Sequence, residues 1–388
     1  MVRRSIEALA KLSRLLVSVS GVLIVAGSGA SCSEGSALPS GASVDAGPPD
    51  SRAEAIDAAA LADGAVAADT GRTTADAGFL RFSLAGTHPQ AMLQPAGGRG
   101  LSTVVAWNEK IYAGFGDWTA NTGPIAINPY DPSTRSFAAS PLVTVPTEAI
   151  DRFRVLDGTL YAPMTDPIAG ESSGGFARGT IAGGVESWRS VAPVPATHVL
   201  DMCASGADLF MVGSQSDSAV VWRSTAGGAW SEALRLTPAT GFGRFYYCFV
   251  LGDRLYVQPD FMPPSRVFDG TSWTDGPILS VGAFARPVAF AGRVVWARSG
   301  LQTFDGRTTS TVPLAPVRDI AVDADRLFVL MSDGGLKSTT DLEAWTDVGG
   351  PEIMSALPAG ENAYSLAVLD GVAYVGTSDA NVWEMALR

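Results

Sequence analysis

The stretch VVAWNEKIYAGFGD, residues 104–117, contains two short apolar strands joined by a tight turn, with the aromatic Tyr112 in the second strand. Six further copies follow: FRVLDGTLYAPMTD (153–166), DMCASGADLFMVGS (201–214), YCFVLGDRLYVQPD (247–260), PVAFAGRVVWARSG (287–300), DIAVDADRLFVLMSD (319–333) and LAVLDGVAYVGTSD (366–379). The equivalent second-strand positions are Tyr112, Tyr161, Phe210, Tyr256, Val295, Phe328 and Tyr374, about 44 residues apart on average. Units of about 40–50 residues that each contain several strands are typical of the blades of a β-propeller.

Each unit has room for a second hairpin, which usually carries a tryptophan in its last strand. Such hairpins are ARGTIAGGVESWRSV (177–191), VVWRSTAGGAWSEA (220–233), SRVFDGTSWTDG (265–276) and LKSTTDLEAWTDV (336–348), and the fifth unit has GLQTFDGRTTSTV (300–312) without the tryptophan. Four strands per unit are therefore expected. Because one small sheet cannot bury its own faces, these aromatic residues are expected to pack between neighbouring blades rather than to contact a ligand.

The last unit supplies only three strands and ends at NVWEMAL, whereas an additional strand, FLRFSL (residues 79–84), precedes the first unit. Pairing these two ends would complete the final sheet and remove two exposed edges. The sequence thus predicts an all-β domain over residues 79–388, a seven-bladed β-propeller closed by its N-terminal strand. The turns TAGGAWS and STTDLEAWT resemble the Asp-box of sialidase-type propellers, and the Tyr-then-Trp spacing with IYAGFGD resembles kelch repeats. These resemblances imply fold and do not select a function.

The first 31 residues have the composition of a secretion signal. Basic residues lead into an apolar run, LLVSVSGVLIVAGSGA (15–30), which is shorter than the about 20 apolar residues of a bilayer span. Small residues then precede Cys32, in the sequence Gly29-Ala30-Ser31-Cys32. This sequence resembles the lipobox of bacterial lipoproteins, although Gly29 stands where that family usually has Leu. The resemblance implies a lipid anchor on Cys32; the alternative is cleavage after Ala30 and plain secretion. We expect an exported protein, located at the outer membrane, in the periplasm or on the cell surface.

Residues 32–78 have no aromatic residue and an acidic surplus, and they are rich in Ala, Asp, Gly and Pro. Such a segment cannot bury enough apolar surface to offset the entropy of ordering, so we predict a disordered tether.

Composition excludes several classes of function. The net charge of −12 argues against nucleic acid, because nucleic-acid binding depends on clustered Lys and Arg. Two histidines and three cysteines argue against an imidazole-rich metal site, a zinc cluster and a disulfide framework. No phosphate-binding loop or metalloprotease motif is present, and no metal or cofactor is expected.

Aspartates recur directly after the second strand of six units, at Asp117, Asp166, Asp217, Asp260, Asp333 and Asp379. In a propeller this turn lies at one rim of the channel. The carboxylates could therefore form a ligand-binding rim together with the loop aromatics Trp118 and Phe261. The alternative is local turn chemistry, because the Asp side chain readily accepts a hydrogen bond from the backbone N–H two residues on.

Cys203 and Cys248 occupy similar places in adjacent units, and either a disulfide or two buried thiols would fit.

Three functional hypotheses follow. The first is a non-enzymatic, membrane-tethered binding or scaffold module, monomeric, whose rim engages a glycan or an envelope protein. The second is a carbohydrate-active enzyme, a glycosidase or polysaccharide lyase, which would need a pair of carboxylates about 5–9 Å apart over a deep cleft. No sequence motif assigns catalytic residues. A purely structural role in an envelope assembly is a third alternative.

Overall fold

The computed structural model describes residues 82–168, 174–260, 264–279, 281–282, 285–314, 316–349 and 352–387. The predicted signal segment (1–31), the lipidation site Cys32, the linker (32–78) and Phe261 lie outside the described residues. No helix among the described residues is long and apolar enough to cross a membrane.

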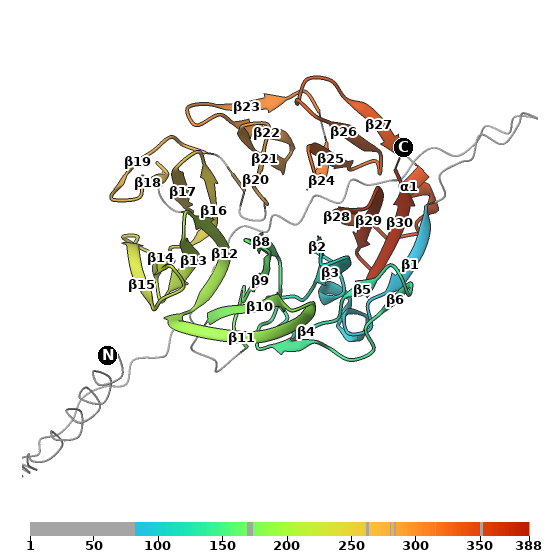
Figure 1. The fold of residues 1–388 in the computed structure, drawn as a ribbon, viewed down its shortest axis with the longest axis horizontal. Helices are drawn as coiled ribbons and strands as arrows, with labels where there is room; N and C mark the ends of the chain where they lie inside the picture. Colours follow the sequence, from blue (N-terminus) through green and yellow to red (C-terminus); the bar gives the residue numbers. More distant parts are fainter. Residues whose placement is uncertain are drawn as a thin grey trace, which may run out of the picture. The chain divides into compact units, whose positions relative to one another are not determined.

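The described strands form seven four-stranded antiparallel sheets arranged as the blades of a ring (Figure 1). The sequence prediction of a seven-bladed β-propeller is therefore confirmed. In every blade the first strand lies nearest the axis, and the following strands step outward.

The strands of blades 1 to 3 are as follows. Blade 1 contains β2 (Thr103–Trp107), β3 (Lys110–Gly114), β5 (Tyr130–Asp131) and β6 (Ser136–Phe137), and a separate pair, β4 (Ile125–Ile127) and β7 (Val143–Val145), lies beside it. Blade 2 contains β8 (Arg154–Leu156), β9 (Thr159–Pro163), β10 (Gly174–Ala182) and β11 (Val185–Ala196). Blade 3 contains β12 (His198–Ser205), β13 (Asp208–Gln215), β14 (Ser218–Thr225) and β15 (Trp230–Leu236).

Blades 4 to 7 repeat this order. Blade 4 contains β16 (Phe245–Leu251), β17 (Arg254–Pro259), β18 (Arg266–Phe268) and β19 (Trp273–Asp275), and blade 5 contains β20 (Val288–Phe290), β21 (Arg293–Arg298), β22 (Gly300–Phe304) and β23 (Thr309–Val312). Blade 6 contains β24 (Val317–Asp323), β25 (Arg326–Met331), β26 (Leu336–Thr339) and β27 (Thr346–Gly349). Blade 7 contains β28 (Ala363–Leu369), β29 (Val372–Thr377), β30 (Asn381–Ala386) and β1 (Ser83–Thr87). The short helices are η1 (Ala91–Leu93), η2 (Ala96–Gly98) and α1 (Glu352–Ala356).

The N-terminal strand closes the ring, as predicted, but it lies later in the chain than residues 79–84. β1 pairs with β30 from Ser83↔Glu384 to Thr87↔Asn381, with an irregularity between Leu84 and Gly86. The Thr87 hydroxyl also donates to the Asn381 side chain at 2.7 Å. The closing strand is thus specified by backbone pairing with β30 and by this side-chain hydrogen bond. Phe82 belongs to the apolar run, residues 79–84, on which the predicted strand was based. In the structure it precedes β1 and stacks on Trp383 of β30, with ring centroids 5.2 Å apart.

The tryptophans of the second hairpins pack against the preceding blade, which confirms their predicted packing role. Trp188 of blade 2 lies 6.0 Å from Trp107 and 5.6 Å from Tyr112 of blade 1, and Trp230 of blade 3 lies 5.8 Å from Phe176 of blade 2. The hydrophobic clusters accordingly lie between sheets. Burying aromatic faces in this way is what holds neighbouring blades together.

Polar side chains on the inner strands add a second type of contact between blades. Asp201 accepts the backbone N–H of Cys248 in the next blade, at 3.1 Å, and Asp319 likewise accepts that of Leu366, at 2.7 Å. The Ser365 hydroxyl donates to the Leu101 carbonyl, at 2.6 Å, across the boundary between blades 7 and 1. All three follow an irregularity in the inner-strand pairing, and such an irregularity redirects a side chain away from the regular alternation.

Candidate functional site

The six predicted rim aspartates do not share one environment. Asp333 accepts the N–H of Gly335 at 2.9 Å, Asp260 accepts the N–H of Arg244 at 2.9 Å, and Asp379 lies 3.6 Å from the Arg99 guanidinium. The backbone carbonyl of Asp217, whose side chain is exposed, accepts the N–H of Gly243. These four residues therefore make turn or loop contacts in separate blades, as the turn-chemistry alternative expects.

The other two rim aspartates, Asp117 and Asp166, lie in the loops that follow the second strands of blades 1 and 2, and the charges of both act on Glu148. Asp117 also closes its own turn, because its carboxylate accepts the N–H of Thr119 at 2.9 Å. Glu148 belongs to the segment that leads from blade 1 into blade 2, and its backbone N–H donates to the Asp166 carbonyl at 2.7 Å. Its own carbonyl accepts the hydroxyl of Thr122 at 2.9 Å, and that hydroxyl also accepts the Asp117 N–H at 2.7 Å. We refer to Asp117, Glu148 and Asp166 as the blade 1–2 seam.

Glu148 is the unusual member of the seam. The residue is only 3% exposed, and the hydrogen bonds of the described residues include none to its carboxyl group. Burial raises the pKa of Glu148, and the charges of Asp166 and Asp117 raise it further, to about 7. The carboxyl oxygens of Glu148 are not among the enclosed polar atoms without a partner in the described residues, so water reaches them. The two like charges still make the ionisation of Glu148 costly.

Two glycines allow the loop of blade 1 to lie directly against the segment that carries Glu148. Gly116 has a φ of +119° and Gly123 a φ of +116°. A β-carbon on Gly116 would collide with the Glu148 carbonyl, and one on Gly123 would collide with the Thr147 carbonyl. Only glycine fits both requirements, positive φ and backbone contact. The loop from Gly116 to Gly123 is thereby held against the segment that carries Glu148.

The seam has an aromatic residue and a histidine beside it. Trp118 directly follows Asp117 and is 39% exposed. Nε2 of His198 lies 3.5 Å from Asp166, and its Nδ1 lies 2.7 Å from the hydroxyl of Ser214. Ser214 is only 1% exposed, so this Ser–His–Asp series does not present a nucleophile to solvent.

Comparison with Glu361 shows how the fold supplies donors to one oxygen, Oε1, of a glutamate at the equivalent position, whereas its Oε2 is buried without a partner. Glu361 precedes Asp379 by the same 18 residues that separate Glu148 from Asp166. The Glu361 carboxylate accepts hydrogen bonds from Thr377, Asn381 and Trp383. Glu148 has two carboxylates nearby instead of donors. Sequence reasoning missed Glu148, although the repeated spacing of a glutamate before a rim aspartate could have revealed it.

Arginine side chains form a second polar cluster, at the axis of the ring. Arg152 lies 2.9 Å from Asp201 of blade 3 and donates to the carbonyls of Tyr246 and Ala285, at 2.7 and 2.6 Å. Arg154 binds both oxygens of Asp201, each at 2.7 Å. Arg286 donates to Thr103 and pairs with Asp319. We refer to Arg152, Arg154, Arg286, Asp201 and Asp319 as the hub.

The hub connects blades that are not neighbours in the ring. Burial acts to raise the pKa of Asp201, but the two guanidinium groups outweigh it and hold the pKa below its usual range. For Asp319, burial prevails over Arg286 and the pKa is raised. The terminal nitrogens of Arg152 and the guanidinium nitrogens of Arg154 all form ion pairs or bonds to backbone carbonyls, so the hub acts as a brace across the axis.

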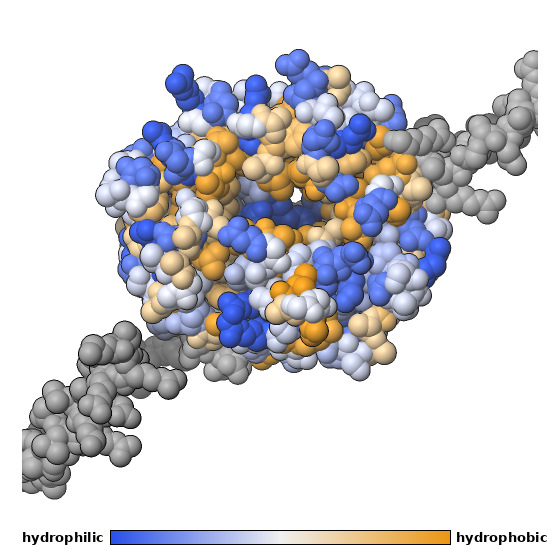
Figure 2. Space-filling view, viewed as in Figure 1, coloured by the Kyte–Doolittle hydropathy of each residue, from blue (hydrophilic) through white to orange (hydrophobic). Residues whose placement is uncertain are grey.

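A channel of about 560 Å³ runs beside the hub, lined by residues from the inner strand of each blade, or from just before it. Figure 2 shows strongly hydrophilic residues inside the central hollow, with apolar residues around it. Cys203 and Cys248 both line this channel, and both are buried free thiols. The disulfide considered from the sequence is therefore not formed in the structure. Burial, and next the neighbouring Cys203, raise the pKa of the Cys248 thiol well above its usual range.

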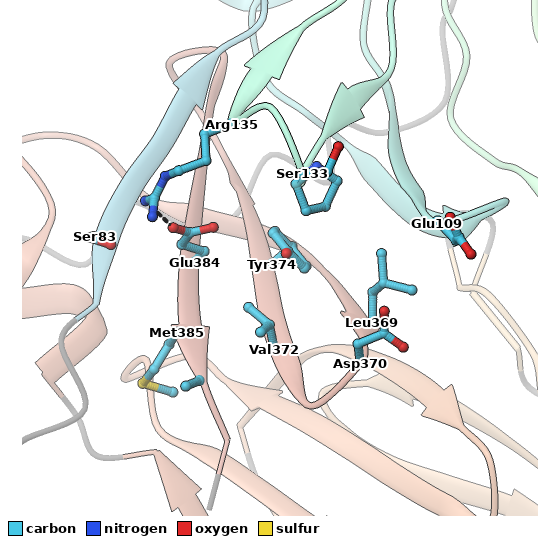
Figure 3. Close-up of a pocket in the computed structure, with 12 residues that line it drawn as sticks. Ser83, Glu109, Ser133, Arg135, Leu369, Asp370, Val372, Tyr374, Glu384 and Met385 are labelled. Carbon is cyan, nitrogen blue, oxygen red and sulfur yellow. Dashed lines mark hydrogen bonds and ion pairs between the residues drawn. The ribbon is translucent and has the colours of Figure 1, made fainter.

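A cleft of about 510 Å³ lies where blades 7 and 1 meet. Figure 3 shows Arg135, from the β5–β6 hairpin, reaching Glu384 of β30 with Tyr374 beside them. Burial raises the pKa of Tyr374 to about 12, with a further contribution from Glu384. The charged pair ties blade 1 to the blade that the N-terminal strand completes, so this cleft belongs to ring closure.

Comparison with known proteins identifies the fold only. No family model matches the sequence, and no curated protein matches it. Solved structures do match. The WD40 domain of Pan2 from Neurospora crassa is 11% identical, covers 76% of this chain and 91% of its own, and has a TM-score of 0.51. A chain of a mitotic checkpoint complex is 12% identical, with coverage of 84% and 100% and a TM-score of 0.50. This likeness supports a β-propeller and does not confirm the kelch or Asp-box subtype.

Proposed function

We propose that this protein is a binding module that uses the propeller as a rigid scaffold and engages a protein partner through the face bearing the blade 1–2 seam. The observation that carries the proposal is Trp118, a large aromatic residue that is 39% exposed and directly follows Asp117 of the seam. Aromatic residues beside a few fixed polar groups are characteristic of interface hot spots. Propellers serve many functions, so the proposal rests on this site and not on the fold.

The other polar clusters have structural explanations, which directs attention to the seam. The hub side chains pair with one another across the axis, and the Arg135–Glu384 pair joins the blades at ring closure. At the seam, by contrast, burial and two neighbouring acids raise the pKa of Glu148 to about 7, so its ionised form is disfavoured. A protein does not retain such an arrangement for stability, because satisfying or removing the group would be favourable.

We further propose that the domain is exported and tethered through lipidated Cys32, with residues 33–78 as the spacer. Support comes from the basic lead, the short apolar run and the small residues before Cys32. Metabolic labelling with a fatty-acid probe tests this anchor. The label should enter the wild-type chain and be absent from Cys32→Ser; equal labelling of both chains would overturn it.

Site-directed photo-crosslinking of the full chain in its own cells tests the binding face. A photo-reactive residue at Thr119, next to Trp118, should give a discrete protein adduct. The same residue at Asp305, in the β22–β23 turn, should give none. Equal adducts at both positions, or none at either, would contradict the proposal.

The carbohydrate alternatives are separate outcomes of a parallel test. The purified chain and Trp118→Ala are applied to a glycan array and incubated with reducing oligosaccharides. Retention on the array that is lost in Trp118→Ala would replace the protein partner by a glycan. Cleavage lost in Glu148→Gln would indicate a glycosidase. The protein-binding proposal expects neither result.

A further inference from the structure

The central channel combines charged groups with apolar walls. It encloses about 560 Å³ and is lined by the inner strands of all seven blades, or by residues just before them. A cavity of this size accommodates a small organic molecule. In Figure 2 strongly hydrophilic residues lie inside the hollow, and apolar residues surround it. A ligand that fits must therefore have both a polar group and an apolar body.

The charged residues that line the channel are Arg154 and Arg286, and none of the described lining residues is acidic. Their side chains are 15% and 16% exposed, whereas the paired Asp201 and Asp319 are 0% and 3% exposed. Asp151, on which the charge of Arg286 also acts, does not line the channel. Each ion pair thus presents its positive end to the channel. Because the nearer charge dominates the field that a ligand meets, the channel favours an anion.

Both arginines retain hydrogen-bond donors. Arg154 donates through Nε and Nη2 to Asp201 and through Nη1 to the Pro287 carbonyl. In the described residues, Arg286 uses one terminal nitrogen for Thr103 and the other for its acidic partner. Each terminal nitrogen carries two hydrogens, so further N–H groups remain on both side chains. The same arginines can therefore brace the ring and hold a carboxylate through charge-assisted hydrogen bonds.

The rest of the channel wall contains apolar side chains that the fold leaves uncovered. Val155 of β8 and Val322 of β24 line the channel and are 44% and 39% exposed. Val250 and Val368 line it at the corresponding positions of β16 and β28. The apolar wall begins next to the arginines, because Val155 directly follows Arg154 in the chain. Exposed apolar side chains in a concave site favour a ligand that covers them.

We propose that the channel binds a small amphiphilic anion, an organic molecule with one carboxylate and an apolar body. Its carboxylate contacts Arg154 and Arg286, and its body covers Val155 and Val322. Charge-assisted hydrogen bonds fix the carboxylate, and burial of apolar surface adds affinity for the body. None of the seam residues lines the channel. This site is therefore separate from the proposed protein-binding face and goes beyond the proposed function.

Methyl NMR of the full chain, with octanoate as the ligand, tests this site. Octanoate should cause saturable shifts of the Val155 and Val322 methyl groups. It should leave those of Val185, which is 67% exposed and does not line the channel, in place. Octanamide has the same chain without the charge and should bind about tenfold more weakly, because hydrogen bonds to charged groups are stronger.

Two kinds of variant test the role of charge. Val155 is exposed, so Val155→Glu and Val155→Lys should both fold; the first should weaken octanoate binding and the second strengthen it, each about threefold. Val185→Glu places the same charge outside the channel and should leave the affinity unchanged. Arg286→Gln combined with Asp319→Asn exchanges the ion pair for a neutral pair. This double variant should bind octanoate about tenfold more weakly and octanamide as before.

Four results would overturn the inference. These are no saturable shift with octanoate, equal affinity for octanoate and octanamide, equal effects of Val155→Glu and Val185→Glu, or displacement of octanoate by inorganic phosphate at the same concentration. The last result would show an anion site without a role for the apolar body. Because the two sites are separate, failure of the Thr119 crosslink would leave the channel site in place.

Discussion

Replacing Asp201 by Asn tests the hub as the brace of the ring. Asp201 is fully buried and accepts two bonds from Arg154, one ion pair from Arg152 and the backbone N–H groups of Met202 and Cys248. Asparagine keeps the volume but removes the charge, so two guanidinium groups remain buried without their counter-ion. Breaking a buried pair in this way costs about 3–5 kcal/mol. The free energy of unfolding of Asp201→Asn should fall by that amount.

Urea denaturation of the wild-type chain, Asp201→Asn and Glu232→Gln gives the comparison. Glu232 pairs with Arg235 on the surface, where the two side chains are 42% and 34% exposed, so its loss should cost less than about 1 kcal/mol. The lowered pKa keeps Asp201 ionised from pH 5 to 8, so its effect should be constant over that range. A combined Arg152→Met, Arg154→Met and Asp201→Leu chain should be less destabilised than the sum of its single variants. An Asp201→Asn effect within 1 kcal/mol of wild type would refute the bracing role.

Three further predictions concern the seam, ring closure and the thiols. The folded-state pKa of Glu148 is raised from 4.5 to about 7, so its ionisation penalty is absent below pH 4.5 and complete above pH 7. Glu148→Gln should therefore gain stability in urea melts at pH 8.5 and almost none at pH 4.5; equal gains at both would contradict this. Deletion of Ser83–Thr87 exposes the edge of β30 and should produce oligomers in light scattering, whereas a stable monomer would show that β1 is dispensable. In Cys32→Ser, Ellman's reagent should detect no thiol in the folded chain and two after denaturation without reductant; none after denaturation would indicate a bridge between Cys203 and Cys248.

The fold could be predicted from the sequence because its signal is repeated. Seven hairpins with an aromatic second strand, such as the one around Tyr112, are required by sheets that bury their faces only against each other. The closing strand was placed too early because residues 79–84 are more apolar than Ser83–Thr87. Its true position depends on backbone pairing with β30, and composition carries no signal for that.

The site was predictable only in part. The recurrence of aspartate identified Asp117 and Asp166, yet the same signal also reports turn formation: Asp117 and Asp333 each accept the N–H of the residue two positions on. Glu148 lies in a connecting segment without periodicity, and it meets the two aspartates only because Gly116 permits the contact between loops. Likewise, Arg152 reaches carbonyls of blades 4 and 5 across the axis, and contacts between such distant parts of the chain are invisible to local patterns.

The most direct test of the account is the ionisation of Glu148 itself, followed by the carbon-13 shift of its carboxyl group from pH 4 to 9, with Glu148→Gln for assignment. The account predicts a midpoint near pH 7 that moves toward 4.5 when Asp117 and Asp166 are both replaced by Asn. A midpoint near 4.5 in the wild-type chain, or one that the double replacement leaves in place, would contradict a carboxyl group whose ionisation is disfavoured by burial and two neighbouring acids.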